Sequence, residues 1–415
     1  MSDSYVPRRA ALIVPALAAV LALSACSPAA EGPSGDKLSV VTTTTQLADF
    51  AHQIGGDDIE LTSLLAPGAS AHHFDPSPKE LVALSQADVL IVNGADLEGF
   101  IDSTIEASGF SGTLVTAADG IDLAEAKEIT AEGEHEADTG EAPDHAGHTH
   151  ADNDHADDDH AGHEHGDHDH DHADHDHAGH DHADHDHADH DHADHDHADV
   201  TETHADEPEA HGDHADHDGH SHGDTNPHLW TSPRYASGMA AEVGRALAQA
   251  DPGNAADYER RATAYEAQLA ALDTWVAEQF ELVPAADRVL VSGHDSLRYY
   301  LHDYGIAYAG AIMPSFEDNA EPSAAELDAL SAKIAERGVK AIFVESSMSP
   351  KLAQAIARET GITVVDGDAL YADSLGTKGS GAETFVAATV HNTQVILEAW
   401  GVTPGPVPAE LEGGA

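Results

Sequence analysis

Histidine is the residue type whose number and placement point most directly to chemistry in this sequence. Of 34 histidines, 27 lie in one stretch between Glu128 and Asp224, which also holds 34 of the 77 acidic residues and neither lysine nor arginine. Imidazole nitrogens and carboxylate oxygens are the side-chain donors that bind divalent transition metals. The composition of this stretch therefore predicts that the protein binds metal cations.

The repeat within this stretch favours many weak sites over one folded site. Asp-His-Asp-His-Ala recurs with a period of five from Asp174 to Ala198, which matches neither a helix nor a strand. Because residues 127–225 offer almost nothing that could form a core, we predict a disordered His/Asp-rich metal-binding loop. The alternative is a solubilising spacer of low complexity.

Seven histidines lie outside the His/Asp-rich loop, and some of them occupy connections that suit a binding site. His72 or His73 follows a predicted strand and a Pro-Gly turn, His294 follows another strand, and His228 directly precedes a helix. Ligands of open α/β sheets gather beyond the carboxyl ends of the strands. Asp373, in a loop rich in Gly and Ser, has a comparable place.

Three histidines are predicted to be structural or surface residues because they fall on helices. They are His52, His302 and His391.

Strands that alternate with helices must position these side chains, and this order predicts parallel sheets. The expected strands are 38–45, 59–65, 88–93 and 113–116, followed by 288–292, 306–311, 340–344 and 362–365. The expected helices are one through Phe50, then 98–108, 233–249, 254–280, 322–337, 350–359 and 382–400. The predicted fold class is α/β, with two parallel-sheet α/β lobes joined by a long linking helix. The disordered loop is inserted in the N-terminal lobe.

The predicted domain boundaries follow the composition of the chain. They are a lipoprotein signal peptide (1–25), a flexible tether (26–36), an N-terminal lobe (37–126), the His/Asp-rich loop (127–225), the end of the N-terminal lobe (226–253), the linking helix (254–282) and a C-terminal lobe (283–415).

The N-terminus predicts export and lipid anchoring. Arg8 and Arg9 precede an apolar run, Ala10 to Leu23, that is too short to span a bilayer. Leu23-Ser-Ala-Cys26 resembles the lipobox of bacterial lipoproteins, and Cys26 is the single cysteine of the chain. We expect a membrane-anchored protein outside the cytoplasm, at the cell surface or in the periplasm. The formal net charge of −60 argues against nucleic acid as a partner.

Several blocks together resemble the metal-binding lipoproteins of zinc and manganese ABC importers, a cluster that includes streptococcal adhesin-like lipoproteins. The blocks are His72-His-Phe-Asp-Pro76, Asn226-Pro-His-Leu-Trp230, Ser292-Gly-His-Asp295, Glu321-Pro-Ser-Ala, Phe343-Val-Glu-Ser-Ser347 and Ala372-Asp-Ser-Leu with Lys378-Gly. They keep the family's order from about Lys37 to Trp400, leaving the His/Asp-rich loop aside.

The resemblance implies a ligand set with two residues from each lobe: His72, His228, His294 and Asp373. It prefers His72 to His73, because the family motif has an aromatic residue two positions after the ligand and Phe74 stands there. His73 and Glu345 remain as secondary candidates, Glu345 behind the ligands. Asn226 departs from the family's usual Asp and is not expected to disturb binding.

Three imidazoles and one carboxylate suit zinc, whereas manganese prefers more oxygen donors. In the family, the third position tends to carry Glu in manganese-specific members and His in zinc members, so His294 indicates Zn²⁺ as the transported ligand. The affinity order leaves Cu(II) and Ni(II) open. Because neutral imidazole is the ligand, binding is expected to weaken as the pH falls through about 6.5.

The resemblance therefore implies a substrate-binding component of an ABC-type zinc importer, a monomer that delivers Zn²⁺ to a permease with its ATPase. One alternative is a manganese or iron receptor of the same fold; another is a zinc-buffering lipoprotein. A zinc hydrolase is a third, but a catalytic zinc keeps one position for water, and Asp373 is expected to fill it. We expect no enzymatic activity.

Overall fold

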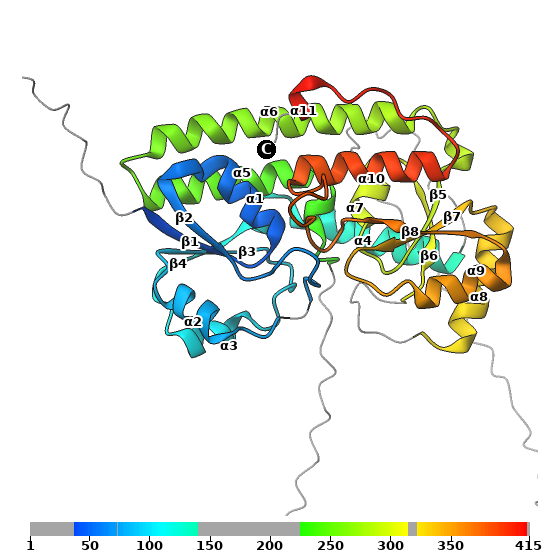
Figure 1. The fold of residues 1–415 in the computed structure, drawn as a ribbon, viewed down its shortest axis with the longest axis horizontal. Coiled ribbons are helices and arrows are strands. Elements are labelled where there is room, and N and C mark those ends of the chain that lie inside the picture. The colour runs from blue at the N-terminus through cyan, green and yellow to red at the C-terminus, as the bar shows by residue number, and fades with distance from the viewer. Residues whose placement is uncertain (1–36, 73, 140–224, 314–321, 413–415) are drawn as a thin grey trace, which may run out of the picture. The chain divides into compact units, whose positions relative to one another are not determined.

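The computed structural model describes residues 37–72, 74–139, 225–313 and 322–412 (Figure 1). Within these ranges the chain forms two parallel sheets of four strands each. The first sheet has the order β2-β1-β3-β4, with β1 Leu38–Thr42, β2 Ile59–Ser63, β3 Val89–Val92 and β4 Thr113–Thr116. The second has the order β6-β5-β7-β8, with β5 Val289–Ser292, β6 Ala307–Ala311, β7 Ala341–Glu345 and β8 Thr363–Leu370. In each sheet the order of the strands reverses once, between β1 and β3 in the first and between β5 and β7 in the second. Open α/β sheets bind ligands at such a switch point, beyond the carboxyl ends of the strands.

The N-terminal lobe has helices on both faces of its sheet (Figure 1). Its helices are α1 (Thr45–Gly55), α2 (Pro78–Ser85), α3 (Ile101–Ser108) and α5 (Pro233–Ala250), with short 3-10 turns η1 (Gly56–Asp58), η2 (Ala117–Gly120) and η3 (Leu229–Thr231). Helix α4 (Leu123–Thr139) leaves this lobe and packs against β6 and α7 (Arg298–Asp303) of the C-terminal lobe. One face packs on α1 and α5 through the main core, and the other on α2 and α3 through a smaller cluster around Leu84 and Leu90. Local signals start these helices: Thr44 caps α1, and Ser77 forms a capping box with Glu80 for α2.

The C-terminal lobe repeats this arrangement. Its helices are α7 (Arg298–Asp303), α8 (Ala324–Arg337), α9 (Lys351–Thr360), α10 (Phe385–Ala399) and α11 (Ala409–Glu412), with the turn η4 (Ala285–Asp287). Helices α8 and α9 pack on one face of the sheet through a separate cluster that includes Leu330 and Ile356. The predicted capping box of Ser323 and Glu326 is present at the start of α8.

The long helix α6 (Ala255–Phe280) lies along both lobes, beside α1 and α5 at one end and α10 at the other (Figure 1). Its buried residues include the predicted stripe of Tyr258, Tyr265, Leu269, Leu272, Val276 and Phe280. These side chains belong to one core cluster that continues from the first lobe into the second. The predicted linking helix, and with it the predicted fold class, is confirmed.

The predicted start of the His/Asp-rich loop at residue 127 is wrong, because α4 continues to Thr139. Ala126, Ile129 and Thr130 are buried along one side of this helix. Gly133 follows them, and a methyl group there would overlap the guanidinium of Arg298. The apolar stripe is short and stands among charged residues, which concealed it in the sequence.

Other boundaries near the ends of strands also differ from expectation, as two examples show. The helix expected from residue 98 begins at Ile101, because the Glu98 carboxylate instead accepts hydrogen bonds from Thr43 Oγ1 and from the backbone N–H groups of Asn93 and Gly94. Strand β8 runs to Leu370 and not to residue 365, so the sheet ends three residues before Asp373.

Several predictions lie outside the described residues. They are the signal peptide, the tether with Cys26, His73, Glu321 and the greater part of the His/Asp-rich loop. Among the helices that the structure does describe, none combines the length and the apolar character needed to cross a bilayer.

Candidate metal centre

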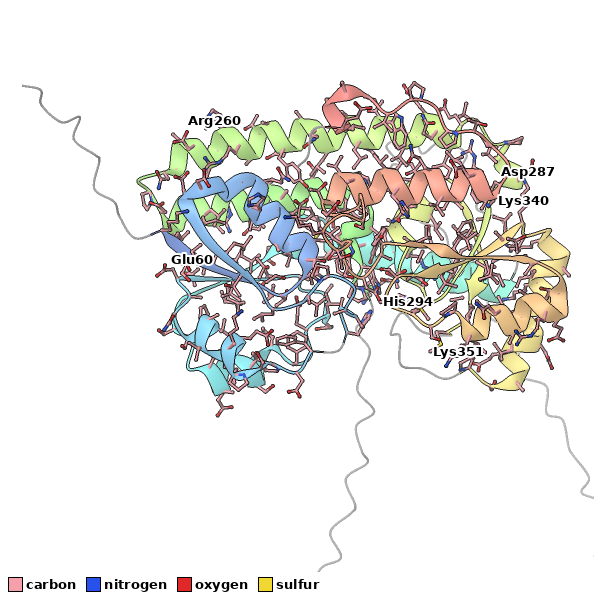
Figure 2. All side chains as sticks on the ribbon, viewed as in Figure 1. Glu60, Arg260, Asp287, His294, Lys340 and Lys351 are labelled. Atoms are coloured by element: carbon pink, nitrogen blue, oxygen red, sulfur yellow. The ribbon has the colours of Figure 1, made fainter. Side chains whose placement is uncertain are left out.

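The four residues implied as ligands lie together where the carboxyl ends of the two sheets face each other. One potential ligand atom from each of His72, His228, His294 and Asp373 lies within 4.8 Å of all the others. His228 Nε2 is 3.0 Å from His72 Nε2 and 3.3 Å from His294 Nε2. Asp373 Oδ1 is 3.1 Å from His294 Nε2 and 3.5 Å from His228 Nε2. Figure 2 shows His294 at the junction of the two lobes.

His72 lies on the connection between β2 and α2. Its backbone N–H donates to Ser70 Oγ at 3.2 Å, and its side chain is partly exposed. Phe74, two residues on, packs against Phe100 with the ring centroids 5.1 Å apart. The aromatic residue therefore anchors the loop to the lobe while the histidine faces the other ligands.

His228 is buried directly before η3 and α5. Its ring Nδ1 lies 2.7 Å from Asn226 Oδ1, which also accepts the backbone N–H of His228 at 3.1 Å. Trp230, two residues after His228, donates from Nε1 to the carbonyl of Ala372 at 2.7 Å. The segment that carries His228 is thereby tied to the loop that carries Asp373.

His294 follows β5 and is held by the Glu345 carboxylate at the end of β7. Glu345 accepts from the backbone N–H groups of Gly293 (3.0 Å) and His294 (3.3 Å) and from Ser296 Oγ (3.0 Å). Its Oε1 is 3.3 Å from His294 Nδ1. A β-carbon on Gly293 would lie 2.1 Å from Glu345 Oε2, so only glycine permits this close approach.

Asp373 is buried three residues after β8, and Ser347 Oγ donates to its Oδ2 at 2.6 Å. The N-terminal lobe fixes the rest of this loop. Gln46 Nε2 donates to the carbonyl of Ala372 at 3.0 Å, and Thr45 Oγ1 accepts from Leu375 N–H at 2.9 Å. Asp373 thus sits in a loop of one lobe that the other lobe holds in place.

The charges in the centre shift the pKa values of two candidate ligands in opposite directions. Burial alone would lower the pKa of His294, but the carboxylates of Asp373 and Glu345 outweigh it and raise that pKa well above the ordinary value. Burial alone would raise the pKa of Asp373, but His294 and His228 hold it well below its usual range. The centre therefore favours a positive charge beside Asp373.

The geometry fits a tetrahedral cation. Bonds of about 2.0–2.1 Å from a central zinc to four ligands would separate neighbouring ligand atoms by about 3.3–3.4 Å. Four of the six separations, from 3.0 to 3.5 Å, lie around this value, and the two that join His72 to His294 and to Asp373 are within 4.8 Å. Asp373 Oδ1 is buried, and within the described residues no hydrogen bond of good geometry satisfies it. A cation among the three Nε2 atoms would give this oxygen its partner.

The other histidines with described positions stay outside the cluster, as predicted. His52 is exposed on α1, His302 is partly exposed on α7, and His391 packs against Tyr371 from α10. Glu345, predicted as a secondary candidate, lies beside His294, and its role there stays a prediction. Sequence reasoning did not identify Ser296 and Ser347 as supports, since an isolated serine in a loop carries no signal of its partner.

The chain resembles known metal-binding proteins along almost its whole length. A model of the family described as "ZnuA: Zinc-uptake complex component A periplasmic" matches residues 40–399. The chain belongs to this family. It is therefore a metal-binding, substrate-binding protein of an ABC transporter that acts outside the cytoplasm, and it is not an enzyme.

Relatives of this ZnuA-family chain are named for different metals. The manganese-binding lipoprotein MntA of Bacillus subtilis (strain 168) is 25% identical over 395 residues, 94% of this chain and 99% of MntA. The zinc-binding protein TroA of Treponema pallidum (strain Nichols) is 32% identical over 177 residues, 42% of this chain and 57% of TroA. The iron-binding protein YfeA of Yersinia pestis is 24% identical over 396 residues, 95% of this chain and 96% of YfeA.

A solved structure has the same fold. The periplasmic zinc binding protein TroA from Treponema pallidum superposes with a TM-score of 0.60 at 22% identity, covering 88% of this chain and 99% of TroA. The described residues therefore have the two-lobe fold of the family.

Proposed function

We propose that this protein is the zinc-binding component of an ABC importer, and that His72, His228, His294 and Asp373 hold the ion. The observation that carries the proposal is the donor set: three imidazole nitrogens and one carboxylate oxygen lie within 4.8 Å of one another, and four of their six separations are close to those of a zinc tetrahedron. Zinc is the cargo and not a cofactor. The protein captures it between the lobes and presents it to the permease, which the ATPase drives.

All four ligands come from one chain, so a monomer is sufficient for binding. We propose that acylation of Cys26 anchors it to the membrane on the outer side. Replacement of Cys26 by Ser is expected to abolish incorporation of labelled palmitate and to release the protein from membranes.

Manganese is the second candidate, because MntA, a relative that matches nearly the full chain, is named for it. The donor set argues the other way. Mn²⁺ favours oxygen ligands and more than four of them, and only one of the four residues here supplies oxygen.

Competition between the two metals tests the proposal. The full chain is titrated with Zn²⁺ against a chelator that strips weak sites, and the titration is repeated in excess Mn²⁺. We expect one tight zinc site that manganese does not displace and that disappears in His294→Ala. Equal competition by manganese, or a tight site that survives in His294→Ala, would refute the assignment.

A further inference from the structure

Asn226 uses every hydrogen-bonding group that it has, and it is fully buried. Its backbone N–H donates to Thr130 Oγ1 at 3.0 Å, and its carbonyl accepts from Tyr299 Oη at 2.6 Å. Its side-chain Nδ2 donates to the carbonyl of Asp295 at 2.6 Å, while Oδ1 faces His228. A single residue thus connects α4, α7 and the loops of two metal ligands.

The orientation of the Asn226 amide follows from its partners. The backbone N–H of His228 can only donate, so the atom 3.1 Å away must be the amide oxygen. The carbonyl of Asp295 can only accept, so the atom facing it must be the amide nitrogen. The reverse orientation would set donor against donor at one end and acceptor against acceptor at the other.

This orientation decides which nitrogen of His228 carries the proton. Nδ1 lies 2.7 Å from an oxygen that can only accept, so Nδ1 must bear the hydrogen in the neutral ring. The lone pair is then on Nε2, the atom 3.0 Å from His72 Nε2 and 3.3 Å from His294 Nε2. Asn226 therefore presents His228 to a cation in the tautomer that can bind it.

The amide nitrogen of Asn226 has a separate consequence. Its bond to Asp295 joins the segment of His228 to the residue that follows His294. An aspartate at this position could accept both bonds from His228, but its second oxygen would face the carbonyl of Asp295 without a proton between them. A buried carboxylate in that place would carry an uncompensated repulsion.

We infer that Asn226 is a positioning residue with two roles, one for the oxygen and one for the nitrogen of its side-chain amide. The oxygen sets the tautomer of His228, and the nitrogen holds the His228 and His294 loops in register. The inference deepens the proposed function, because it takes His228 as a metal ligand.

Two substitutions separate the roles. Asn226→Ala removes both, and we expect Zn²⁺ affinity to fall about 10–100-fold, the usual cost of losing such an outer partner. Asn226→Asp keeps the acceptor and loses the donor. We expect it to restore Zn²⁺ affinity most of the way to wild type, but to give the metal-free protein a lower Tm than wild type. Gln279→Ala is the matched control. Gln279 lies on α6, away from the centre, and its buried amide accepts from the backbone N–H of Gly405. Its loss should lower Tm and leave Zn²⁺ affinity unchanged.

The tautomer is read in the metal-free protein by long-range ¹⁵N–¹H NMR of neutral histidine rings, with the His228 signal assigned by its loss in His228→Gln. We expect a single Nδ1–H form in wild type and Asn226→Asp, and a mixture in Asn226→Ala. A single Nδ1–H form in Asn226→Ala, or Asn226→Asp binding zinc no better than Asn226→Ala, would overturn the first role. An unchanged or raised Tm in Asn226→Asp would overturn the second. If wild type bound no zinc tightly, the proposed function would fail, while the NMR result would still decide the tautomer.

Discussion

The two lobes contribute unequally built halves to the metal centre. In the C-terminal lobe, His294 and Asp373 are fully buried, and each has a dedicated polar partner, Glu345 and Ser347. In the N-terminal lobe, His228 is equally buried beside Asn226, but His72 is partly exposed on the long connection after β2. The difference indicates that the C-terminal half is preorganised, and that His72 is the one proposed ligand of the four that solvent reaches.

The largest effect is expected from damage to the buried half. His294→Ala leaves the Glu345 carboxylate buried without its ring partner, and Asp373→Ala removes the one anionic ligand. We expect each to weaken Zn²⁺ binding by more than about 100-fold, beyond the cost of losing an outer partner. Chelator competition measures the loss, and His302→Ala, on α7 outside the centre, is the control that should bind as wild type does.

A smaller effect is expected from His72, the partly exposed member of the proposed ligand set. In His72→Ala, water can take the vacated position, as it does in zinc sites with three protein ligands. We expect a loss of affinity at least about tenfold smaller than in His294→Ala, equivalent to about 1.4 kcal/mol. His73→Ala should leave affinity unchanged. If His72→Ala were as damaging as His294→Ala, the proposed asymmetry between the halves would be incorrect.

Glu345→Gln tests whether the preorganisation of the buried half depends on charge. The amide oxygen can still accept a backbone N–H from the Gly293 loop, but it no longer supports His294 with a negative charge. We expect Zn²⁺ affinity to fall near the lower end of the 10–100-fold range for outer partners. Calorimetry should show the loss mainly in the enthalpy of binding; no loss would assign Glu345 a purely structural role.

The sequence predicted this asymmetry only in part. Continuous apolar strands and β-branched residues located all eight strands, and their order along the chain gave the parallel sheets. The four ligands were implied by family motifs, and spacing alone left His72 and His73 equivalent. The contacts of Asn226 with Asp295 and of Ser347 with Asp373 join residues 69 and 26 positions apart. Such pairs depend on how two loops meet in space, which neither periodicity nor local motifs encode.

The smallest predicted effect concerns a hydrogen-bonded contact between α1 of the N-terminal lobe and α10 of the C-terminal lobe. Asp49 on α1 accepts from the backbone N–H of Phe385 at the start of α10 (2.8 Å) and from Tyr265 Oη of α6 (3.3 Å). Burial raises the pKa of Asp49 despite these bonds.

A carboxyl whose pKa is higher in the folded state binds its proton more tightly there than in the unfolded chain. As the pH rises from the unfolded value of about 3.9 through the raised folded value, this group therefore removes stability, and above that window its contribution is constant. Asp49→Asn can keep the acceptor for Phe385 and has no proton to lose. We expect the Tm of Asp49→Asn minus the Tm of wild type to increase as the pH rises through this window, and to stay constant above it. A Tm difference that is the same on both sides of the window would show that the pKa of Asp49 is the same in the folded and the unfolded chain. The contact between α1 and α10 would then make no pH-dependent contribution to stability.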